Sequence, residues 1–272
     1  MPPMKVVLIT GASSGFGMLV AERLLAEGHA VYAAARRVER MAPLAAKGAH
    51  LLAMDVTDAA SVEAGVAQVL AEQGRIDVLF NNAGYGSYGA VECVPMEEVR
   101  RQYEVNVFGV GRLIQAVVPH MRARRQGVVI NTSSVVGQIS MPMLGWYAST
   151  KHAVEALSDA LRMELGPLGI DVVVIEPGPV RTEFEATAFA TFARVAHPEE
   201  YRARAAAFER FSHAMYAKAP GPESTADAVM KAIHARRPRA RYATTWMAAV
   251  LPRVRRWLGD RLFDWAMLGR LK

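Results

Sequence analysis

Tyr147 and Lys151 form a Tyr-x-x-x-Lys pair whose chemistry would be proton transfer. A tyrosine phenol has a pKa of about 10, so at neutral pH it is a poor base unless a nearby charge stabilises its phenolate. Residues four apart lie on the same face of a helix. At ~4 Å and an effective dielectric constant of ~20, an ammonium stabilises an anion by roughly 4 kcal/mol, or at most about three pKa units. The pair therefore predicts a tyrosine acid or base that works near neutral pH.

A glycine-rich turn, Thr-Gly-Ala-Ser-Ser-Gly-Phe-Gly at residues 10–17, lies earlier in the chain, directly after the apolar run 6–9. Glycines allow a tight turn from strand to helix and a close approach of the backbone to a pyrophosphate, which the helix N-terminus attracts. The turn predicts a dinucleotide cofactor bound by Gly11, Ser13, Ser14, Gly15, Phe16 and Gly17. Together with the Tyr-x-x-x-Lys pair, it indicates hydride transfer with a nicotinamide cofactor.

The end of the second apolar run indicates which nicotinamide cofactor is used. An acidic residue there would bind the ribose 2′-hydroxyl of NAD, whereas arginine suits the 2′-phosphate of NADP. The run ends in Ala35, Arg36 and Arg37, with no carboxylate. We therefore expect NADP rather than NAD, with Arg36 ahead of Arg37 as the phosphate ligand and Ser13 as an auxiliary.

Apolar runs rich in Val, Ile and Leu alternate with helical stretches along most of the chain. Continuous rather than alternating hydrophobicity is typical of strands covered on both faces, and such alternation of strands and helices predicts right-handed crossovers. We expect an α/β fold: one Rossmann-type domain, a doubly wound parallel sheet with helices on both faces. About seven strands are expected, at residues 6–9, 30–35, 49–54, 76–80, 127–130, 170–175 and 240–244.

Polar clusters follow four of these runs, where the carboxyl ends of parallel strands would meet. Asp55 follows the third run, residues 81–84 follow the fourth, residues 133–134 the fifth and residues 177–178 the sixth. Packing alone gives no reason for this coincidence. We expect the active site at this edge of the sheet.

The ordered motifs now identify a family resemblance. Thr-Gly-x-x-x-Gly-x-Gly at residues 10–17, Asn-Asn-Ala-Gly at 81–84, a serine thirteen positions before Tyr147, Tyr-x-x-x-Lys and Pro-Gly-x-Val-x-Thr at 177–182 resemble the short-chain dehydrogenases/reductases. The resemblance covers roughly residues 5 to 182. Within the family, Val-Tyr-Ala at 31–33, the following Arg36 and the extended C-terminus are most similar to the 17β-hydroxysteroid and retinol dehydrogenase branch.

The resemblance implies a role for each matching residue. Tyr147 would be the acid/base, Lys151 its electrostatic partner and a ribose ligand, Ser134 the hydroxyl that holds the substrate oxygen, and Asn106 the holder of a water in a proton relay. Asp55 would bind the adenine amino group, although a carboxylate there could instead cap the following helix. The other cofactor contacts implied are Val56, Asn82, Ala83, Gly84, Pro177, Gly178, Val180 and Thr182.

The residues that follow the catalytic motifs are mostly large and apolar, which favours a lipophilic alcohol or carbonyl as substrate. Besides Ser134 and Tyr147, we expect Met141, Met143 and Phe184 to contact it; Tyr85, Val135, Leu144 and Trp146 have the same character, and some of these can be core residues. The family keeps a substrate lid in the segment that corresponds here to residues 183–220.

Length and composition set the remaining expectations. The 272 residues are 52% hydrophobic, enough for one large domain, and the single Cys93 cannot form an intrachain disulfide. The N-terminus shows no cleavable apolar stretch, and the apolar runs are too short to span a bilayer, so we expect a cytoplasmic protein. The histidines are scattered and lack metal-ligand spacing, so no metal is expected.

The formal charge of +6 is concentrated in residues 236–272, which carry ten Lys or Arg against Asp260 and Asp264. No nucleic-acid motif accompanies them, so nucleic-acid binding is not expected. Residues 244–272 form a basic amphipathic extension that also holds Trp246, Trp257 and Trp265. It could lie on an anionic membrane surface, cap the substrate pocket or form a dimer contact.

These observations together predict an NADP-dependent oxidoreductase that interconverts a hydrophobic secondary alcohol and its ketone or aldehyde, with a steroid-like, retinoid-like or keto-acyl-like substrate. Two alternatives remain open: a 3-ketoacyl carrier-protein reductase, and a non-catalytic NADP sensor on the same fold. The family resemblance also implies a homodimer or homotetramer through the helices that carry Asn106 and Tyr147.

Overall fold

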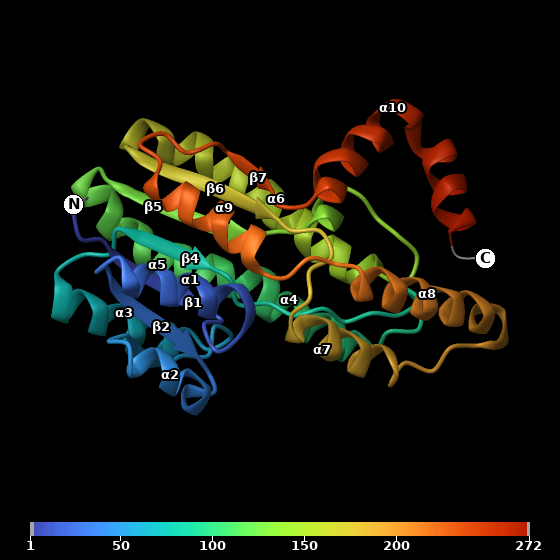
Figure 1. Cartoon of the computed structure of the whole chain (residues 1–272), viewed down its shortest axis with the longest axis horizontal. Helices are drawn as coiled ribbons and strands as arrows, with labels where there is room; N and C mark the ends of the chain where they lie inside the picture. The colour runs from blue at the N-terminus through green and yellow to red at the C-terminus, as the bar shows by residue number, and fades with distance from the viewer. Residues whose placement is uncertain (1–2, 271–272) are drawn as a thin grey trace.

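Seven parallel strands form one twisted sheet in the order β3-β2-β1-β4-β5-β6-β7 (Figure 1). The structure is a computed structural model that describes residues 3–270. The strands are β1 (Val6–Thr10), β2 (Ala30–Ala35), β3 (His50–Ala53), β4 (Val78–Asn81), β5 (Gly127–Thr132), β6 (Ile170–Glu176) and β7 (Arg241–Ala243). The expected doubly wound α/β fold is confirmed, with strand boundaries within two residues of those predicted.

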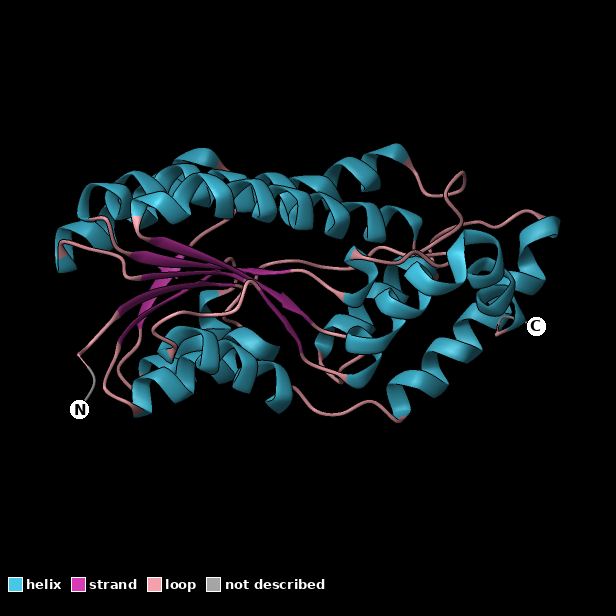
Figure 2. Ribbon diagram, turned by 90° about the horizontal axis from the view of Figure 1, so that it is seen from above, coloured by secondary structure: helices cyan, strands magenta, loops and turns pink. Residues whose placement is uncertain are grey.

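Helices cover both faces of the sheet, as Figure 2 shows in a view along its edge. One face is covered by α1 (Gly15–Ala26), α2 (Ala42–Ala45) and α9 (Glu223–His234). The other is covered by α3 (Ala59–Gln73), α5 (Gly109–Arg124) and α6 (Gly145–Leu165), with α4 (Met96–Tyr103) leading into α5. Every residue of β1 is buried because both of its faces are covered, which explains its continuous apolar sequence.

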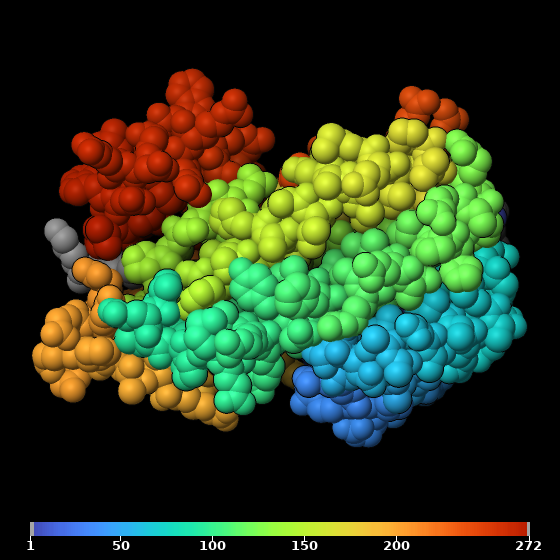
Figure 3. All heavy atoms as spheres, turned by 180° about the vertical axis from the view of Figure 1, so that it is seen from behind, coloured from blue at the N-terminus to red at the C-terminus, as the bar shows by residue number. Residues whose placement is uncertain are grey.

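Three further helices lie beyond the carboxyl ends of the strands. They are α7 (Glu183–Phe192), α8 (Glu199–Ala217) and α10 (Trp246–Gly269). Their inner faces form a third apolar core around Phe192, Phe208 and Phe263, separate from the two cores that flank the sheet. Seen from behind, α10 stands out as a lobe at one end of the molecule (Figure 3).

None of the helices within residues 3–270 combines the length and the apolar character that crossing a bilayer requires. α10 is the longest of them, but it is interrupted at Gly259, whose φ of 70° and ψ of 171° break the helical geometry. Pro252 also lies within α10. The C-terminal extension expected from the sequence is therefore two short helical arms joined at a kink.

Candidate active site

Helix α6 carries Tyr147 and Lys151 on one buried face, at 7% and 5% exposure. Their four-residue spacing stacks them one turn apart, as the sequence predicted. The Lys151 Nζ lies 5.9 Å from the centre of the Tyr147 ring and donates a hydrogen bond to the carbonyl oxygen of Thr132 at 2.8 Å. The end of β5 thus fixes the ammonium beside the phenol.

The pKa values of the pair are set mainly by burial. Removal from water raises the pKa of Tyr147 above its usual range, and Ser134, by hydrogen bonding to the phenol, opposes this rise. The same burial lowers the pKa of Lys151 to about 8, although the nearby Glu155 carboxylate acts in the opposite direction. The sequence predicted that the charge of Lys151 would lower the pKa of Tyr147. In the structure that pKa is raised, and burial is the largest cause.

Ser134 lies two residues after the end of β5 and hydrogen-bonds to the Tyr147 hydroxyl. Its Oγ donates to the carbonyl oxygen of Pro177 at 3.4 Å and accepts from the amide of Val136 at 3.3 Å. The Oγ of Ser133 is buried without a hydrogen-bond partner and lies under Gly137, where an added Cβ would approach it to 2.5 Å. The geometry therefore favours Ser134, not Ser133, as the serine that faces the Tyr147 hydroxyl.

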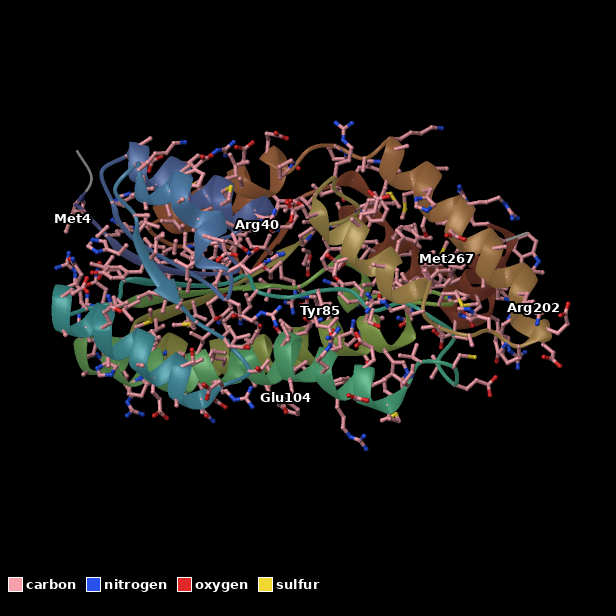
Figure 4. The ribbon with its side chains drawn as sticks, turned by 90° about the horizontal axis from the view of Figure 1, so that it is seen from below. Met4, Arg40, Tyr85, Glu104, Arg202 and Met267 are labelled. Atoms are coloured by element: carbon pink, nitrogen blue, oxygen red, sulfur yellow. The ribbon has the colours of Figure 1, made fainter. Side chains whose placement is uncertain are left out.

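Asn106 lies one layer behind the cavity, in a π-helical turn between α4 and α5, and is 1% exposed. Its Oδ1 accepts from the amide of Tyr85 at 3.0 Å, and its Nδ2 donates to the carbonyl oxygen of Tyr85 at 2.9 Å and to the hydroxyl of Thr150 at 3.2 Å. Wide helical turns of this kind are frequent at functional sites. Asn106 therefore fixes the backbone of Tyr85, which lies between the sheet and the outer helices (Figure 4).

The glycine turn forms a cradle that side chains would fill. Gly11 has a φ of 66°, and a Cβ added to it would lie 2.9 Å from the Cα of Ala83. A Cβ on Gly17 would lie 2.6 Å from the carbonyl oxygen of Gly11. Asn82 holds the turn in place by donating from Nδ2 to the carbonyl oxygens of Thr10 and Gly11. The turn thus exposes backbone amides at the N-terminus of α1, which fits a pyrophosphate.

The turn and the catalytic pair line one continuous cavity of about 420 Å³. All the predicted cofactor residues line it except Gly17, which packs α1 against the turn beneath. The other predicted residues on its wall are Gly11, Ser13, Ser14, Gly15, Phe16, Arg36, Arg37, Asp55, Val56, Asn82, Ala83, Gly84, Tyr147, Lys151, Pro177, Gly178, Val180 and Thr182. The residues therefore fit an extended dinucleotide running from Arg36 to Tyr147.

Asp55 does not cap the helix that follows it. The N-cap of α3 is Asp58, whose side chain accepts from the amide of Ala60. The Oδ1 of Asp55 accepts instead from the amide and the hydroxyl of Thr57, at 2.9 and 2.8 Å. This local turn fixes the carboxylate on the cavity wall, at the end expected for adenine.

An ion pair that the sequence did not reveal joins the segment after β2 to α7, beside the cavity that Glu183 lines. Arg40, in the short helical turn after β2, contacts Glu183 at the first position of α7. This contact and the charge of Arg37 lower the pKa of the Glu183 carboxyl. The pair joins residues 143 positions apart in the sequence, so no local pattern signals it.

The substrate end of the cavity is apolar and is only partly built from the residues predicted. Met141 and Phe184 line it, and Phe184 lies 5.5 Å from Tyr147 between ring centres. Met143 does not: it is 3% exposed and packs in the core behind, with a φ of 66°. The rest of the wall was not expected from the sequence. Two loops contribute Tyr88 and Ile139, and the outer helices α8 and α10 contribute Phe208, Phe211, Met215, Tyr216, Met247 and Leu251.

A second cluster of titratable groups lies far from this cavity, where α1 and α9 end. Glu27, His29 and His234 place their ligand-type atoms within 4.8 Å of one another. The Nδ1 of His29 accepts from the amide of Lys5 at 3.2 Å, so the proton of the neutral ring is on Nε2, which faces Glu27 at 3.5 Å. With its proton on Nε2 and its Nδ1 lone pair taken by the Lys5 amide, the neutral His29 ring has no free lone pair for a metal ion. Sequence spacing could not show the cluster because α9 comes so late in the chain.

Comparisons with known proteins agree with this arrangement. The family model described as short chain dehydrogenase matches residues 5–192. The chain is 35% identical to the uncharacterized oxidoreductase YbbO of Escherichia coli over 266 residues, 97% of this chain and 94% of that protein. A short-chain dehydrogenase from Streptomyces avermitilis has the same fold, with a TM-score of 0.82 and 34% identity, over 99% of this chain and 98% of that one. The chain therefore belongs to the short-chain dehydrogenases/reductases and is an oxidoreductase.

Two further relatives match a shorter part of the chain. The 3-ketodihydrosphingosine reductase of Bacteroides thetaiotaomicron is 44% identical over 181 residues, 66% of this chain and 65% of that protein. The NADPH-dependent 3-dehydrocapnine reductase of Ornithobacterium rhinotracheale is 43% identical over 189 residues, 66% of this chain and 67% of that protein. The match to the first of these thus spans just under two thirds of its length.

Proposed function

We propose that this enzyme reduces a ketone on a long-chain, hydrophobic molecule with NADPH, through Tyr147, Lys151, Ser134 and Asn106. The observation that carries the proposal is the single cavity: its polar end is the glycine cradle with Arg36 and Arg37, and its apolar end is closed over the phenol of Tyr147. A bound NADPH would supply the hydride to the carbonyl carbon.

The side chains of this protein would manage the proton and the developing charge. Tyr147 donates its proton to the carbonyl oxygen as that oxygen becomes an alkoxide, and Ser134 donates a hydrogen bond to the same atom. Burial keeps Tyr147 protonated at neutral pH, which is the state that reduction requires. Lys151 stabilises the phenolate that is left, and Asn106 holds the Tyr85 backbone beside this pair.

We propose NADP over NAD because the two residues that follow β2 on the cavity wall are arginines and neither is a carboxylate. Arg36 and Arg37 are both exposed there and are able to donate to a 2′-phosphate. One relative at 43% identity is named as NADPH-dependent. A solved relative from Burkholderia phymatum, 28% identical, is a complex with NAD, so the family itself does not decide the choice.

The substrate class follows from the apolar wall and from the relatives. Phe184, Phe208, Phe211 and Met215 surround the space beside Tyr147 with groups that cannot bind a sugar or a charged acid well. Two relatives are named for 3-keto groups on sphingosine- and capnine-type molecules. We propose a long-chain keto amphiphile, within the keto-acyl-like class expected from the sequence. The steroid-like and retinoid-like options stay as predictions.

The alternative of a 3-ketoacyl carrier-protein reductase has one observation in its favour. Arg101 lines the cavity and lies over the Tyr85 ring at 5.3 Å, and α10, which carries several arginines, also contributes to the cavity wall. A basic entrance could receive an acidic carrier protein. A solved reductase of that type from Brucella melitensis is 28% identical.

One experiment tests the proposal: NADPH consumption by the purified enzyme with a panel of ketones. The panel contains a 3-keto sphingoid base, a keto steroid, retinaldehyde, acetoacetyl thioesters on coenzyme A and on acyl carrier protein, and acetone. We expect the 3-keto sphingoid base to give the highest kcat/KM. A preference for the carrier-protein thioester would favour the alternative, and no turnover of any ketone would overturn the proposal.

Two features of the whole molecule belong to the same proposal. We propose that α7 and α8 act as a lid, because both contribute to the wall of the substrate end and α7 is joined to the segment after β2 by the Arg40–Glu183 pair. We also propose a homodimer or homotetramer through α5, the π-helical turn before it and α6, where Phe108, Leu157 and Met163 are 50%, 45% and 69% exposed. Apolar side chains this exposed on the elements that carry Asn106 and Tyr147 suit a subunit contact.

A further inference from the structure

We infer that α10 is a docking surface for an anionic lipid bilayer and that the enzyme takes its substrate from that bilayer. The delivery of substrate rests on the proposed function, whereas the docking does not. The outer side of α10 exposes three tryptophans, its inner side lines the substrate cavity, and its charge is basic.

The exposed apolar residues of α10 lie on one face of each arm. In the arm before Gly259, Trp246, Val250 and Trp257 are 72%, 42% and 88% exposed and are separated by four and seven residues, so they form a stripe along one side. In the arm after Gly259, Leu262, Trp265 and Leu268 follow one another at three-residue intervals and are 57%, 75% and 41% exposed, and Leu258, just before the kink, is 41% exposed. Three tryptophans this exposed within residues 3–270 are not accounted for by packing within the chain.

The opposite side of α10 is packed against the protein. Ala248 and Phe263 are 3% and 2% exposed, and Met247 and Leu251 line the substrate end of the cavity. Arg255 donates to the carbonyl oxygen of Gln138 at 3.1 Å, next to the turn that follows Ser134. The helix is therefore anchored, and its outer stripe is a stable feature of the surface. A helix that is apolar on two sides needs a second apolar environment.

The charge of α10 selects a bilayer with anionic lipids over a neutral one. Arg253, Arg256, Arg261 and Arg270 are exposed on it, against the acids Asp260 and Asp264. Tryptophan flanked by arginine is the composition that binds at the level of lipid head groups, where the indole ring is half in the acyl region and the guanidinium contacts phosphate. The same face has a shallow, mainly apolar hollow in which an acyl chain could bind, lined by Val250, Arg253, Val254, Trp257 and Leu258.

The position of α10 connects this surface to the active site. One helix carries both Trp246, on the outside, and Met247 and Leu251, on the cavity wall. α10 and α8 lie at the end of the molecule opposite Met4, where Figure 4 labels Arg202 and Met267. A long-chain ketone has its acyl chain in the bilayer, so an enzyme seated on α10 could draw it into the cavity without exposing that chain to water.

The docking is tested without substrate or cofactor, by co-sedimentation of the full chain with vesicles. Vesicles of phosphatidylcholine alone are compared with vesicles containing 30% phosphatidylglycerol, at about 0.1 M and 1 M salt. We expect binding to the anionic vesicles at low salt, at least tenfold weaker binding at high salt, and at least tenfold weaker binding for Trp257→Ala/Trp265→Ala. Met4→Ala/Met96→Ala, which removes exposed methionines elsewhere, is the matched control and should bind as the parent does.

The role of the charge is tested by Arg253→Glu/Arg256→Glu, which should abolish binding to the anionic vesicles. The control Arg122→Glu/Lys218→Glu makes the same change in net charge, on α5 and just after α8, and should bind these vesicles as the parent does.

Sedimentation velocity tests whether α10 is instead a subunit contact. If the parent binds neither kind of vesicle and the tryptophan variant forms a smaller oligomer, α10 is a subunit contact and the inference is overturned. Equal binding by the parent and the tryptophan variant would overturn it as well.

Turnover separates this inference from the proposed function. The tryptophan variant should reduce a water-soluble ketone at the rate of the parent, but a vesicle-embedded 3-keto sphingoid base at least tenfold more slowly. If vesicles bind and no ketone is reduced, the proposed function fails while the docking stands. If the vesicle-embedded substrate is reduced equally by both proteins, the delivery of substrate through α10 is overturned.

Discussion

The ammonium of Lys151 lies beside the Tyr147 ring, 5.9 Å from its centre, while its hydrogen bond goes to the carbonyl oxygen of Thr132 at 2.8 Å. The two side chains are buried together, and burial acts on them in opposite directions: it raises the pKa of the phenol and lowers that of the amine. Each shift favours the neutral form of its group. At neutral pH the Tyr147 phenol therefore keeps its proton, and the Lys151 ammonium has a pKa of about 8, close to that pH.

Replacement of the phenol tests the role of Tyr147 as the proton donor. Tyr147→Phe should lower kcat for ketone reduction by about 10²- to 10⁴-fold, the usual range for a lost general acid. NADPH affinity, measured by fluorescence titration, should change little because the ring is kept. Tyr103→Phe removes a hydroxyl that bonds to Ser149 on the other side of α6 and is the control. Activity retained by Tyr147→Phe would refute the assignment.

The lowered pKa of Lys151 predicts how the rate depends on pH. Since the ammonium is the active form and its pKa is about 8, kcat/KM for reduction should fall as the pH rises through about 8. Glu155→Gln removes the carboxylate that raises this pKa, so the decline should move to lower pH. Asp159→Asn is the matched control, because Asp159 pairs with the same Arg241 as Glu155 does. Identical pH profiles for the parent and Glu155→Gln would exclude Lys151 as the titrating group.

The features that depend on neighbouring residues in the chain were predicted correctly from the sequence. The strands are continuous apolar runs, and the residues at their carboxyl ends follow from chain order, so the positions of Ser134 and Asp55 on the cavity wall could be expected. The four-residue spacing of Tyr147 and Lys151 placed them on one helical face. Each of these features depends on a few neighbouring residues and on one rule of geometry.

The sequence could not predict what depends on distant residues. Tyr216 and Leu251 reach the cavity from helices far along the chain, and the Arg40–Glu183 pair joins two elements that no local pattern connects. Met143 was expected in the pocket because it is apolar and close to the catalytic motifs in sequence. Its backbone, with φ at 66°, directs it into the core instead. The rise in the Tyr147 pKa was missed for the same reason, because burial is a property of the whole assembly of helices around it.

The arginines after β2 predict the cofactor preference. Arg36→Asp should raise the KM for NADPH by about 10- to 100-fold, the equivalent of one lost charge-assisted hydrogen bond, and should affect NADH much less. Arg100→Asp places the same charge change on an exposed site of α4 and should leave both constants near those of the parent. Equal losses for the two cofactors would contradict a 2′-phosphate site at Arg36.

The glycine cradle predicts opposite effects for two glycine-to-alanine changes. Gly17→Ala should lower the free energy of unfolding by about 1–3 kcal/mol, because its Cβ would lie 2.6 Å from a backbone oxygen that cannot move away. Gly111, in the first turn of α5, has open space around its Cβ position, so Gly111→Ala should raise that free energy by about 0.5–1 kcal/mol. Urea titration measures both. A neutral Gly17→Ala would show that the turn is not tightly packed.

The His29 cluster predicts a loss of stability in mild acid. The pKa of His29 is lowered chiefly by burial, against the attraction of Glu27, and the charges of His234 and Lys5 lower it further. A lowered histidine pKa means that the unfolded chain binds the proton more tightly, so stability is complete above about pH 6.5 and falls as the pH drops below it. His29→Asn keeps an acceptor for the Lys5 amide but cannot titrate, so its free energy of unfolding should change less between pH 7.5 and pH 5.5. His120→Asn replaces an exposed histidine on α5 and should keep the dependence of the parent. If His29→Asn and the parent lose equal stability over this range, other groups are responsible for the acid sensitivity.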